Sequence, residues 1–349
     1  PFISYGGSSL GSYMVIICII LYISMRILLF LNSLIPVSNY GGTQRVMWSL
    51  GKALTQMGHK VYFLAKAGST CDFASVIPYD SAVDLIKQIP QDVDVVHFNG
   101  TAPCGFEKPY VVTYHGNFMG GDLDRNAIFV SKDHASRYNS DSFVYNGLDW
   151  DEYGPVDLNA SRHYYHFLGK AAWRVKNVQG AIDVVKALPN EKIYILGGYR
   201  FNFKMGMRFT VTSKARFKGM VGGVKKNRYL QHSKGLIFPV KWDEPFGLAI
   251  TESLYFGAPV FATPYGSLPE LVKPEVGFLT DSESEMILHL KEGVVYSPMI
   301  CHEYARDLFN AEIMAKAYLQ KYEKVLNGEY LNENYPHALV PDSKRPWKK

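Results

Sequence analysis

The sequence Glu244-Pro245-Phe246-Gly247-Leu248-Ala249-Ile250-Thr251-Glu252 joins two carboxylates through a Pro-Phe-Gly turn and a helical run. Pro245 suits the first turn of a helix because its φ angle is fixed and it has no N–H group to leave unpaired. The next three N–H groups would then point toward an anion such as a diphosphate; they belong to Phe246, Gly247 and Leu248. Glu244, just ahead of this helix, can accept hydrogen bonds from sugar hydroxyls, and Glu252, two turns later, from a ribose diol. The stretch therefore predicts a site for a nucleotide sugar.

Together with Glu252-Ser253-Leu254 and Gly257-Ala258-Pro259-Val260, this stretch resembles the signature of family 4 retaining glycosyltransferases of the GT-B fold. Glu-x7-Glu alone would be weak evidence, since an amphipathic helix with two solvated acids gives the same spacing. The Pro-Phe-Gly and Gly-Ala-Pro-Val flanks favour the family. The resemblance covers roughly residues 25–326 and implies an α/β protein with two Rossmann-like domains that face each other across a cleft. It also implies sugar transfer with retention of the anomeric configuration.

Short apolar runs alternate with helical patterns from Met25 onward, which is typical of parallel α/β units. A turn-rich break near residues 146–155 separates an N-terminal (acceptor) domain, 25–150, from a C-terminal (donor) domain, 151–310. The resemblance implies that a last helix, 311–326, crosses back to the first domain, and an irregular tail, 327–349, is expected after it. Strands are predicted at 27–31, 61–64, 93–98, 110–114, 128–130, 143–145, 165–168, 193–196, 236–238 and 260–262. The cleft between the domains is the expected ligand site.

Residues 1–24 are expected to lie outside this fold. The run from Met14 is apolar, but Arg26 interrupts it and residues 27–31 read as a buried strand. What remains, 14–23, is too short to span a bilayer. We interpret residues 1–24 as a leader foreign to the native protein or, as an alternative, as a short hydrophobic anchor.

Composition narrows the functional classes further. A hydrophobic content of 47% with 20% charged residues is typical of a globular protein. The four cysteines are scattered without a Cys-x-x-Cys motif, which fits a reducing, cytoplasmic compartment and indicates neither a disulfide framework nor a structural zinc. Between Glu191 and Asp243 there are 12 Lys and Arg residues and no acid. This basic segment suits an anionic donor or lipid, or is simply a solvated face; no nucleic-acid motif accompanies it.

Glycines mark three further candidate donor contacts. Gly41 and Gly42 lie between the first strand and a helix, where the missing side chains let a phosphate or sugar approach the backbone closely. The resemblance places Gly197, at the end of a strand, near the donor. It also places Gly219 and Val221 beside the nucleotide base, which backbone groups would read.

Cations and a histidine complete the candidate site. Lys170 and Lys176 follow a strand and precede a helix, so both can point into the cleft and neutralise a departing diphosphate. The family usually has arginine at the first of these positions, and Arg174 could substitute for it. Two surface lysines are the competing interpretation, and it is stronger for Lys170 than for Lys176. His115, at the end of an apolar strand, is expected to face the transferred sugar, as the His-Gly of the family does.

Other polar residues are interpreted as structural. Asp92-Val93-Asp94 matches the Asp-x-Asp metal motif of a different fold, but it precedes a buried strand. Glu270 is expected to be an anchor, and His97 to be structural or to lie on the acceptor side. No protein-bound metal and no cofactor are expected, since the nucleotide sugar is a substrate.

The predicted activity is hexosyl transfer from a nucleoside-diphosphate sugar to a glycan, lipid or small-molecule acceptor, without a metal. The alternatives are a nucleotide-sugar epimerase on the same fold and a non-catalytic nucleotide-sugar binding protein, which Lys170 in place of arginine keeps open. A lipid acceptor would bring the protein to a membrane surface, with help from the basic tail Lys344-Arg345-Pro346-Trp347-Lys348-Lys349. The sequence does not distinguish UDP, GDP and ADP donors.

Overall fold

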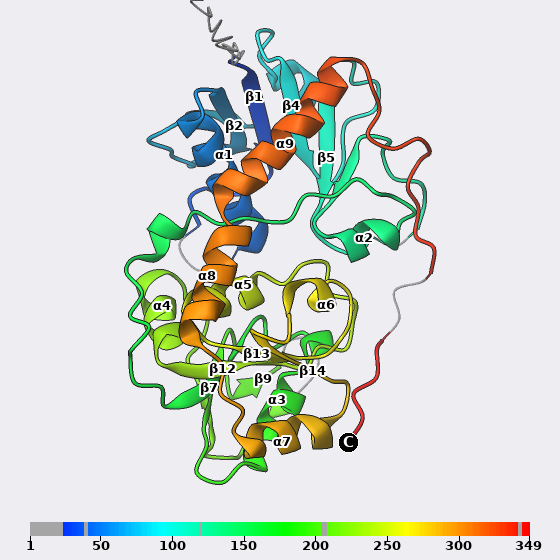
Figure 1. Ribbon diagram of the computed structural model, residues 1–349. Helices are drawn as coiled ribbons and strands as arrows, with labels where there is room; N and C mark the ends of the chain where they lie inside the picture. Colours follow the sequence, from blue (N-terminus) through cyan, green and yellow to red (C-terminus); the bar gives the residue numbers. More distant parts are fainter. Residues whose placement is uncertain (1–23, 38–40, 119, 204–207, 341–343) are drawn as a thin grey trace, which may run out of the picture.

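The first domain is built around a parallel sheet of six strands (Figure 1). A computed structural model describes residues 24–37, 41–118, 120–203, 208–340 and 344–349. The sheet order is β3-β2-β1-β4-β5-β6, and the strands are β1 (Arg26–Leu31), β2 (Lys60–Lys66), β3 (Ser75–Tyr79), β4 (Val95–Asn99), β5 (Tyr110–Tyr114) and β6 (Ala127–Phe129). Its helical segments are α1 (Gly42–Gln56), η1 (Leu85–Gln88), α2 (Lys132–Ser136) and η2 (Trp150–Tyr153).

The second domain repeats this plan with the sheet order β11-β8-β7-β12-β13-β14, also parallel. The strands are β7 (Tyr164–Leu168), β8 (Ile193–Leu196), β11 (Ala215–Phe217), β12 (Ser233–Phe238), β13 (Val260–Ala262) and β14 (Gly277–Leu279). A separate hairpin consists of β9 (Phe201–Asn202) and β10 (Arg208–Phe209). The helical segments are η3 (Arg174–Lys176), α3 (Val178–Lys186), α4 (Gly223–Gln231), α5 (Leu248–Tyr255), α6 (Leu268–Leu271), α7 (Glu283–Glu292) and α8 (Pro298–Leu308). The last helix, α9 (Ala311–Leu326), returns to the first domain.

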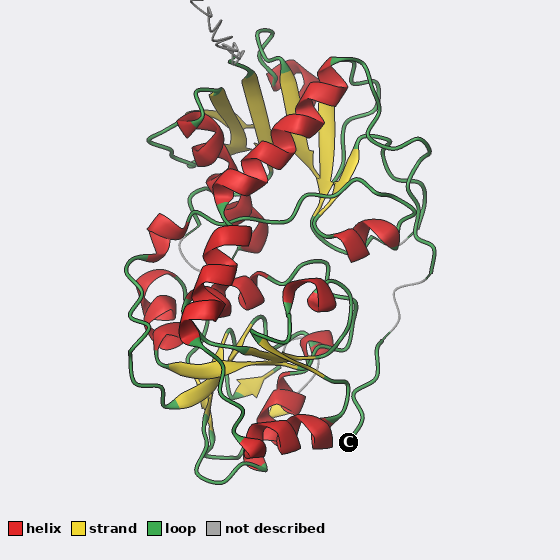
Figure 2. Ribbon diagram, viewed as in Figure 1, coloured by secondary structure: helices red, strands yellow, loops and turns green. Residues whose placement is uncertain are grey.

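Helices cover the sheets of both domains (Figure 2), so most side chains of the central strands are buried. In β1 the side chains of Ile27, Leu28 and Leu29 are all fully buried, which explains a continuous apolar run rather than an alternating one. The expected pair of Rossmann-like domains is thereby confirmed. The prediction of a strand at 143–145 was wrong, since this segment meets β6 only through an isolated bridge between Phe129 and Phe143.

Two long helices connect the domains. α8 packs against α5 in the second domain, and α9 packs against α1 in the first (Figure 1). The chain crosses near Leu148, whose N–H donates to the carbonyl of Phe309. At this point a Cβ atom on Gly147 would lie 2.1 Å from the carbonyl oxygen of Asn310, so the close approach requires glycine.

The described residues of the tail form no helix or strand beyond isolated bridges, yet the tail is bound to the protein. Arg345 pairs with Asp243, Trp347 donates to Glu283 and Lys348 pairs with Asp281. These contacts with the second domain do not favour the expectation that the whole basic tail faces a membrane.

The predicted leader, residues 1–24, lies outside the described residues except for Ser24. Among the helices that the structure describes, none has the length and apolarity needed to cross a membrane.

Candidate donor site

A cavity of about 290 Å³ opens between the two domains, at the carboxyl ends of their strands. Two helix N-termini meet there: α1 begins at Gly42 and α5 at Leu248, and a Cβ atom on Gly42 would lie 3.4 Å from the Leu248 side chain. Unpaired N–H groups at a helix start attract anions, and the helix dipoles add to the effect. The cavity therefore presents two anion-binding helix ends, one from each domain.

Helix α5 begins three residues later than the sequence predicted. Pro245 is not its first residue, because Gly247 adopts a left-handed conformation with φ 95° and is the residue that precedes the helix. The N–H group of Ile250 donates to the carbonyl of Gly247. This shift makes Leu248 and Ala249 the residues whose first-turn N–H groups receive no acceptor from the described chain. Glycine suits this position since a left-handed conformation strains other residues.

Glu244 lies in the loop before α5 and is held by two side chains of its own domain. Lys176 donates to Glu244 Oε2 over 2.5 Å, and the Trp242 indole donates to the same oxygen over 2.8 Å. The ammonium group of Lys176 also lies 4.8 Å from the centre of the Trp242 ring, a favourable cation–π distance. Glu244 and Lys176 are buried yet line the cavity, so both are held in place for a ligand.

Glu252 sits at the centre of a buried cluster that draws on both domains. Its Oε1 accepts hydrogen bonds from Arg45 of α1, from Lys226 of α4 and, over 2.6 Å, from Tyr153. Burial alone raises the pKa of Glu252, but the charges of Arg45 and Lys226 prevail and lower it to about 2. Burial lowers the pKa of Lys226 to about 8, against the opposing attraction of Glu252. No described residue donates to Oε2, which leaves this oxygen for a ligand.

Sequence reasoning did not single out Arg45 or Lys226. Arg45 lies one turn after Gly42, but nothing in the sequence shows that it reaches the other domain. Lys226 is one of 12 bases in the acid-free segment, and only its buried position on α4 distinguishes it from its exposed neighbour Lys225 on the same helix.

His115 lines the cavity from the first domain. Its Nε2 lies 2.7 Å from Oδ1 of Asn99, whose own amide nitrogen donates to the carbonyl of Phe30. Since Oδ1 can only accept, Nε2 carries the proton and Nδ1 keeps a lone pair. Burial lowers the pKa of His115 to about 4, so the ring is neutral at pH 7 and Nδ1 can accept from a hydroxyl.

Five predicted residues do not line the cavity, although nine do. The nine that line it are Gly42, His115, Lys176, Val221, Glu244, Phe246, Gly247, Leu248 and Glu252. The five that do not are Gly41, Lys170, Arg174, Gly197 and Gly219. Lys170 extends over the Trp173 ring, 5.5 Å from its centre, and Arg174 is exposed.

Gly197 and Gly219 are hydrogen-bonded to each other, and Gly197 packs against a residue of the cavity wall. The N–H group of Gly197 donates to the carbonyl of Gly219 over 2.8 Å. A Cβ atom on Gly197 would lie 2.1 Å from the carbonyl oxygen of Gly169, which itself lines the cavity. Glycine at position 197 therefore lets its backbone pack directly against that of Gly169.

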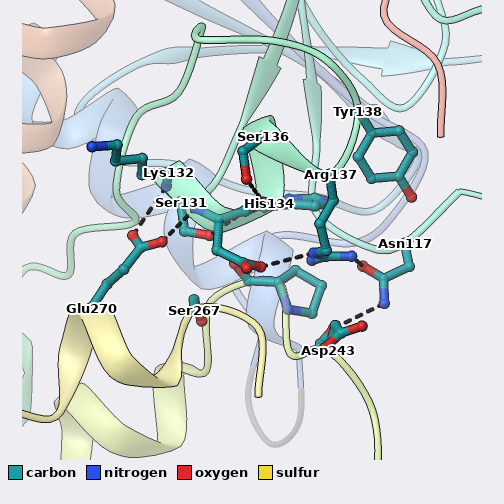
Figure 3. Close-up of polar contacts among 12 residues, drawn as sticks. Asn117, Ser131, Lys132, His134, Ser136, Arg137, Tyr138, Asp243, Ser267 and Glu270 are labelled. Atoms are coloured by element: carbon teal, nitrogen blue, oxygen red, sulfur yellow. Dashed lines mark hydrogen bonds and ion pairs between the residues drawn. The ribbon is translucent and has the colours of Figure 1, made fainter. Parts of the chain in front are cut away.

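Polar contacts fix the two domains to each other beside the cavity (Figure 3). The Glu270 carboxylate accepts from the backbone N–H groups of Lys132 and Asp133 at the start of α2, and Ser131 donates to the carbonyl of Pro245 over 2.7 Å. The anchor role predicted for Glu270 is confirmed by these contacts.

The remaining structural interpretations are confirmed by their contacts. His97 is fully buried between Tyr322 of α9 and Thr113 of β5, and burial lowers its pKa to about 3. Asp94 pairs with Arg26 over 2.7 Å, and Asp92 accepts from Tyr62 over 3.1 Å. Within the described ranges, no three His, Cys, Asp or Glu side chains gather as a metal site would require.

The comparison of families and sequences gives two matches. Residues 156–292, in the second domain, match the family model of glycosyl transferases group 1. An uncharacterized 42.6 kDa protein in the cps region of Klebsiella pneumoniae is 24% identical over 106 residues, which is 30% of this chain. The match spans 26% of that relative's length.

Solved structures resemble this chain over most of its length. A glycosyltransferase involved in avilamycin A biosynthesis is 18% identical, with a TM-score of 0.71 over 87% of this chain and 98% of that one. Sucrose-phosphate synthase from Thermosynechococcus elongatus is 16% identical, with a TM-score of 0.66 over 87% of this chain and 100% of that one. Anabaena HepE in complex with UDP and glucose is 16% identical, with a TM-score of 0.62 over 86% of this chain and 99% of that one. The fold is GT-B, and the group 1 match together with this fold supports a glycosyltransferase.

Proposed function

We propose that this chain transfers a hexose from a nucleoside-diphosphate sugar to an acceptor hydroxyl, with retention of configuration and without a metal. One observation carries the proposal: both domains direct a helix N-terminus into one cavity that also contains three cations and two carboxylates. The cations are Arg45, Lys176 and Lys226, and the carboxylates are Glu244 and Glu252. A diphosphate flanked by hydroxyl-rich sugars on both sides fits this set of groups.

The donor would lie along the cavity with its diphosphate between the starts of α1 and α5. Lys176 then faces the phosphate that bears the sugar, and Glu244, which Lys176 holds, accepts from the sugar hydroxyls. Glu252 offers Oε2 to the ribose diol. His115 offers Nδ1 to the transferred sugar from the first domain. No described residue hydrogen-bonds to Oε2 of Glu252 or to Nδ1 of His115, and this supports the roles proposed for these two atoms.

In the transfer step, the bond between the anomeric carbon and the phosphate oxygen breaks, and its electron pair stays on the diphosphate. The acceptor oxygen forms a new bond to the anomeric carbon and gives up its proton, for which the departing phosphate oxygen is the nearest base in this arrangement. Preorganised cations and N–H dipoles stabilise the charge that develops on the leaving group. Arg45 and Lys226 supply positive charge that Lys170 and Arg174 do not bring to the cavity, so lysine in place of arginine at position 170 does not by itself argue for a non-catalytic binding protein.

The proposed donor is a UDP, GDP or ADP sugar. Among the structural neighbours, HepE is in complex with UDP-glucose, and starch synthase IV from Arabidopsis thaliana is bound to ADP and acarbose. The proposed acceptor is a hydroxyl of a glycan, a lipid or a small molecule, and a lipid acceptor would bring the chain to a membrane surface.

The test measures nucleotide release from UDP-, GDP- and ADP-sugars in the presence of EDTA, with wild-type protein and Lys176→Ala. We expect slow hydrolysis of one donor, and a loss of about 100-fold or more in the variant because leaving-group stabilisation is removed. Lys186→Ala, which removes an exposed lysine of α3, is the matched control and should leave the rate unchanged.

Each result has a clear meaning. Release that requires added metal would contradict the metal-independent mechanism. An unchanged rate in Lys176→Ala would remove the leaving-group role of this residue. Rearranged donor recovered without hydrolysis would favour the epimerase, whereas nucleotide binding without turnover across a broad acceptor panel would favour the binding protein.

A further inference from the structure

The tail after α9 binds both domains in turn. In Figure 1 it runs from the end of α9 along the first domain and ends beside α7 of the second. Its first anchor is the buried Asn332, which donates to the carbonyl oxygens of Arg125 and Ala127 over 2.9 and 3.0 Å. Asn332 also accepts from Ser140 over 2.5 Å. A buried side chain with three partners fixes this part of the tail to the first domain.

The second anchor is Arg345, which binds the second domain at Asp243. The guanidinium group donates three hydrogen bonds to the Asp243 carboxylate, at 2.9, 3.0 and 2.7 Å. The backbone N–H of Arg345 donates to the carbonyl of Lys241 over 2.9 Å. Paired hydrogen bonds between an arginine and a carboxylate fix geometry as well as charge. Asp243 is buried and Arg345 is partly exposed, so the carboxylate is the better shielded member of the pair.

Asp243 lies between the two loops that carry predicted sugar contacts. Glu244 follows it directly in the chain. The carbonyl oxygen of Asp243 accepts from the side chain of Asn117 over 2.9 Å, and Asn117 lies two residues after His115. Arg137, which directly follows α2, completes the connection by donating to Oδ1 of Asn117 over 3.0 Å (Figure 3). Asp243, which belongs to the Glu244 loop, therefore binds the His115 loop through its backbone carbonyl and Arg345 through its carboxylate.

We propose that Arg345 is a positioning residue for the sugar-binding side of the cavity. By holding Asp243, the tail keeps Glu244 and His115 at a fixed separation across the cleft. This inference rests on the proposed function for its effect on transfer, whereas its effect on loop order does not depend on it. Misplacing a substrate-contacting group by about 1 Å can cost on the order of 100-fold in rate.

The experiment compares Arg345→Ala, Arg345→Lys and Lys344→Ala in the full chain. Lys344 is the matched control because it is the exposed cation next to Arg345 in the tail. We measure kcat and KM for the donor that the nucleotide-release test selects. Hydrogen exchange of residues 115–118 and 243–246 is followed by mass spectrometry. In Arg345→Ala we expect kcat to fall on the order of 10- to 100-fold with KM changed less, and faster exchange in both segments. Arg345→Lys, which keeps the charge without the fork, should recover part of kcat.

Several results would overturn the proposal. Exchange that stays at the wild-type rate in Arg345→Ala would show that the tail does not order these loops. A kcat within twofold of wild type, or an equal loss in Lys344→Ala, would remove the positioning role. If the wild-type protein neither binds nor turns over any nucleotide sugar, the proposed function fails, and hydrogen exchange still decides whether the tail orders both loops. If Arg345→Ala unfolds, the same measurements on Arg345→Lys decide.

Discussion

Replacing Glu252 by glutamine should destabilise the protein by about 3 kcal/mol at pH 7. Glutamine keeps the shape and can still accept from Tyr153, but it leaves Lys226 buried without an anion. The magnitude follows from the pKa of Glu252, which is about 2 in the folded protein against an ordinary 4.5. At about 1.36 kcal/mol for each pH unit, this difference corresponds to roughly 3 kcal/mol of stabilisation by the ionised carboxylate.

The sign of the pH dependence follows from the lowered pKa. The stabilisation by Glu252 is fully present above pH 4.5 and is lost as the pH falls toward 2, since the unfolded chain takes up the proton first. The difference in unfolding free energy between wild type and Glu252→Gln should therefore shrink as the pH falls below 4.5.

Urea unfolding followed by tryptophan fluorescence, at a series of pH values from 7 to 3.5, measures this difference. Glu312→Gln is the control: it removes an exposed carboxylate that pairs with Lys316 on α9 and should change stability by less than about 0.5 kcal/mol. Equal stability of Glu252→Gln and wild type at pH 7 would refute the reasoning. So would a difference that stays constant below pH 4.5, because it would show that the carboxylate charge is not its source.

Three further predictions concern the residues around this cluster. Because burial lowers the pKa of His115 to about 4, the profile of kcat/KM should show no inflection from this histidine between pH 5.5 and 8; an inflection that His115→Asn abolishes would contradict this. Gly197→Ala should cost about 2 kcal/mol or more in urea unfolding, since its Cβ would meet the backbone of Gly169. Tyr322→Phe should cost about 1–2 kcal/mol by calorimetry because His97 loses its 2.7 Å partner in the core.

The central strands could be predicted because a parallel sheet buried on both faces requires continuous apolar runs. β5 and β8 have the predicted bounds, and β1 contains the predicted run. β3 could not be predicted in this way, because it lies at the sheet edge, where its side chains are half exposed and include Pro78. β9 and β10 have only two residues each, too few for any periodic pattern.

The candidate site was predictable where a residue acts through its own segment. Glu244 and the Pro-Phe-Gly turn form one continuous loop, so the local sequence indicates their place in the cavity. Arg45 and the tail's Arg345 act on distant segments instead, and Arg45 does so across the domain interface. Their partners, Glu252 and Asp243, are 207 and 102 residues away in the chain, a separation over which no local pattern operates. The sequence therefore predicts the donor side of the cavity better than the contacts that bring the two domains together.

The two carboxylates of the Glu-x7-Glu stretch do not work as a pair on one helix. Gly247 delays the helix, so Glu244 stays in a loop beside Lys176, and only Glu252 lies on α5, beside Lys226. Each carboxylate thus orients one lysine before any ligand binds. For Lys226 this orientation has a second effect: burial already lowers its pKa to about 8, and the attraction of Glu252 opposes a further fall. Glu252 would therefore serve donor binding twice, through the ribose and by keeping Lys226 charged at neutral pH.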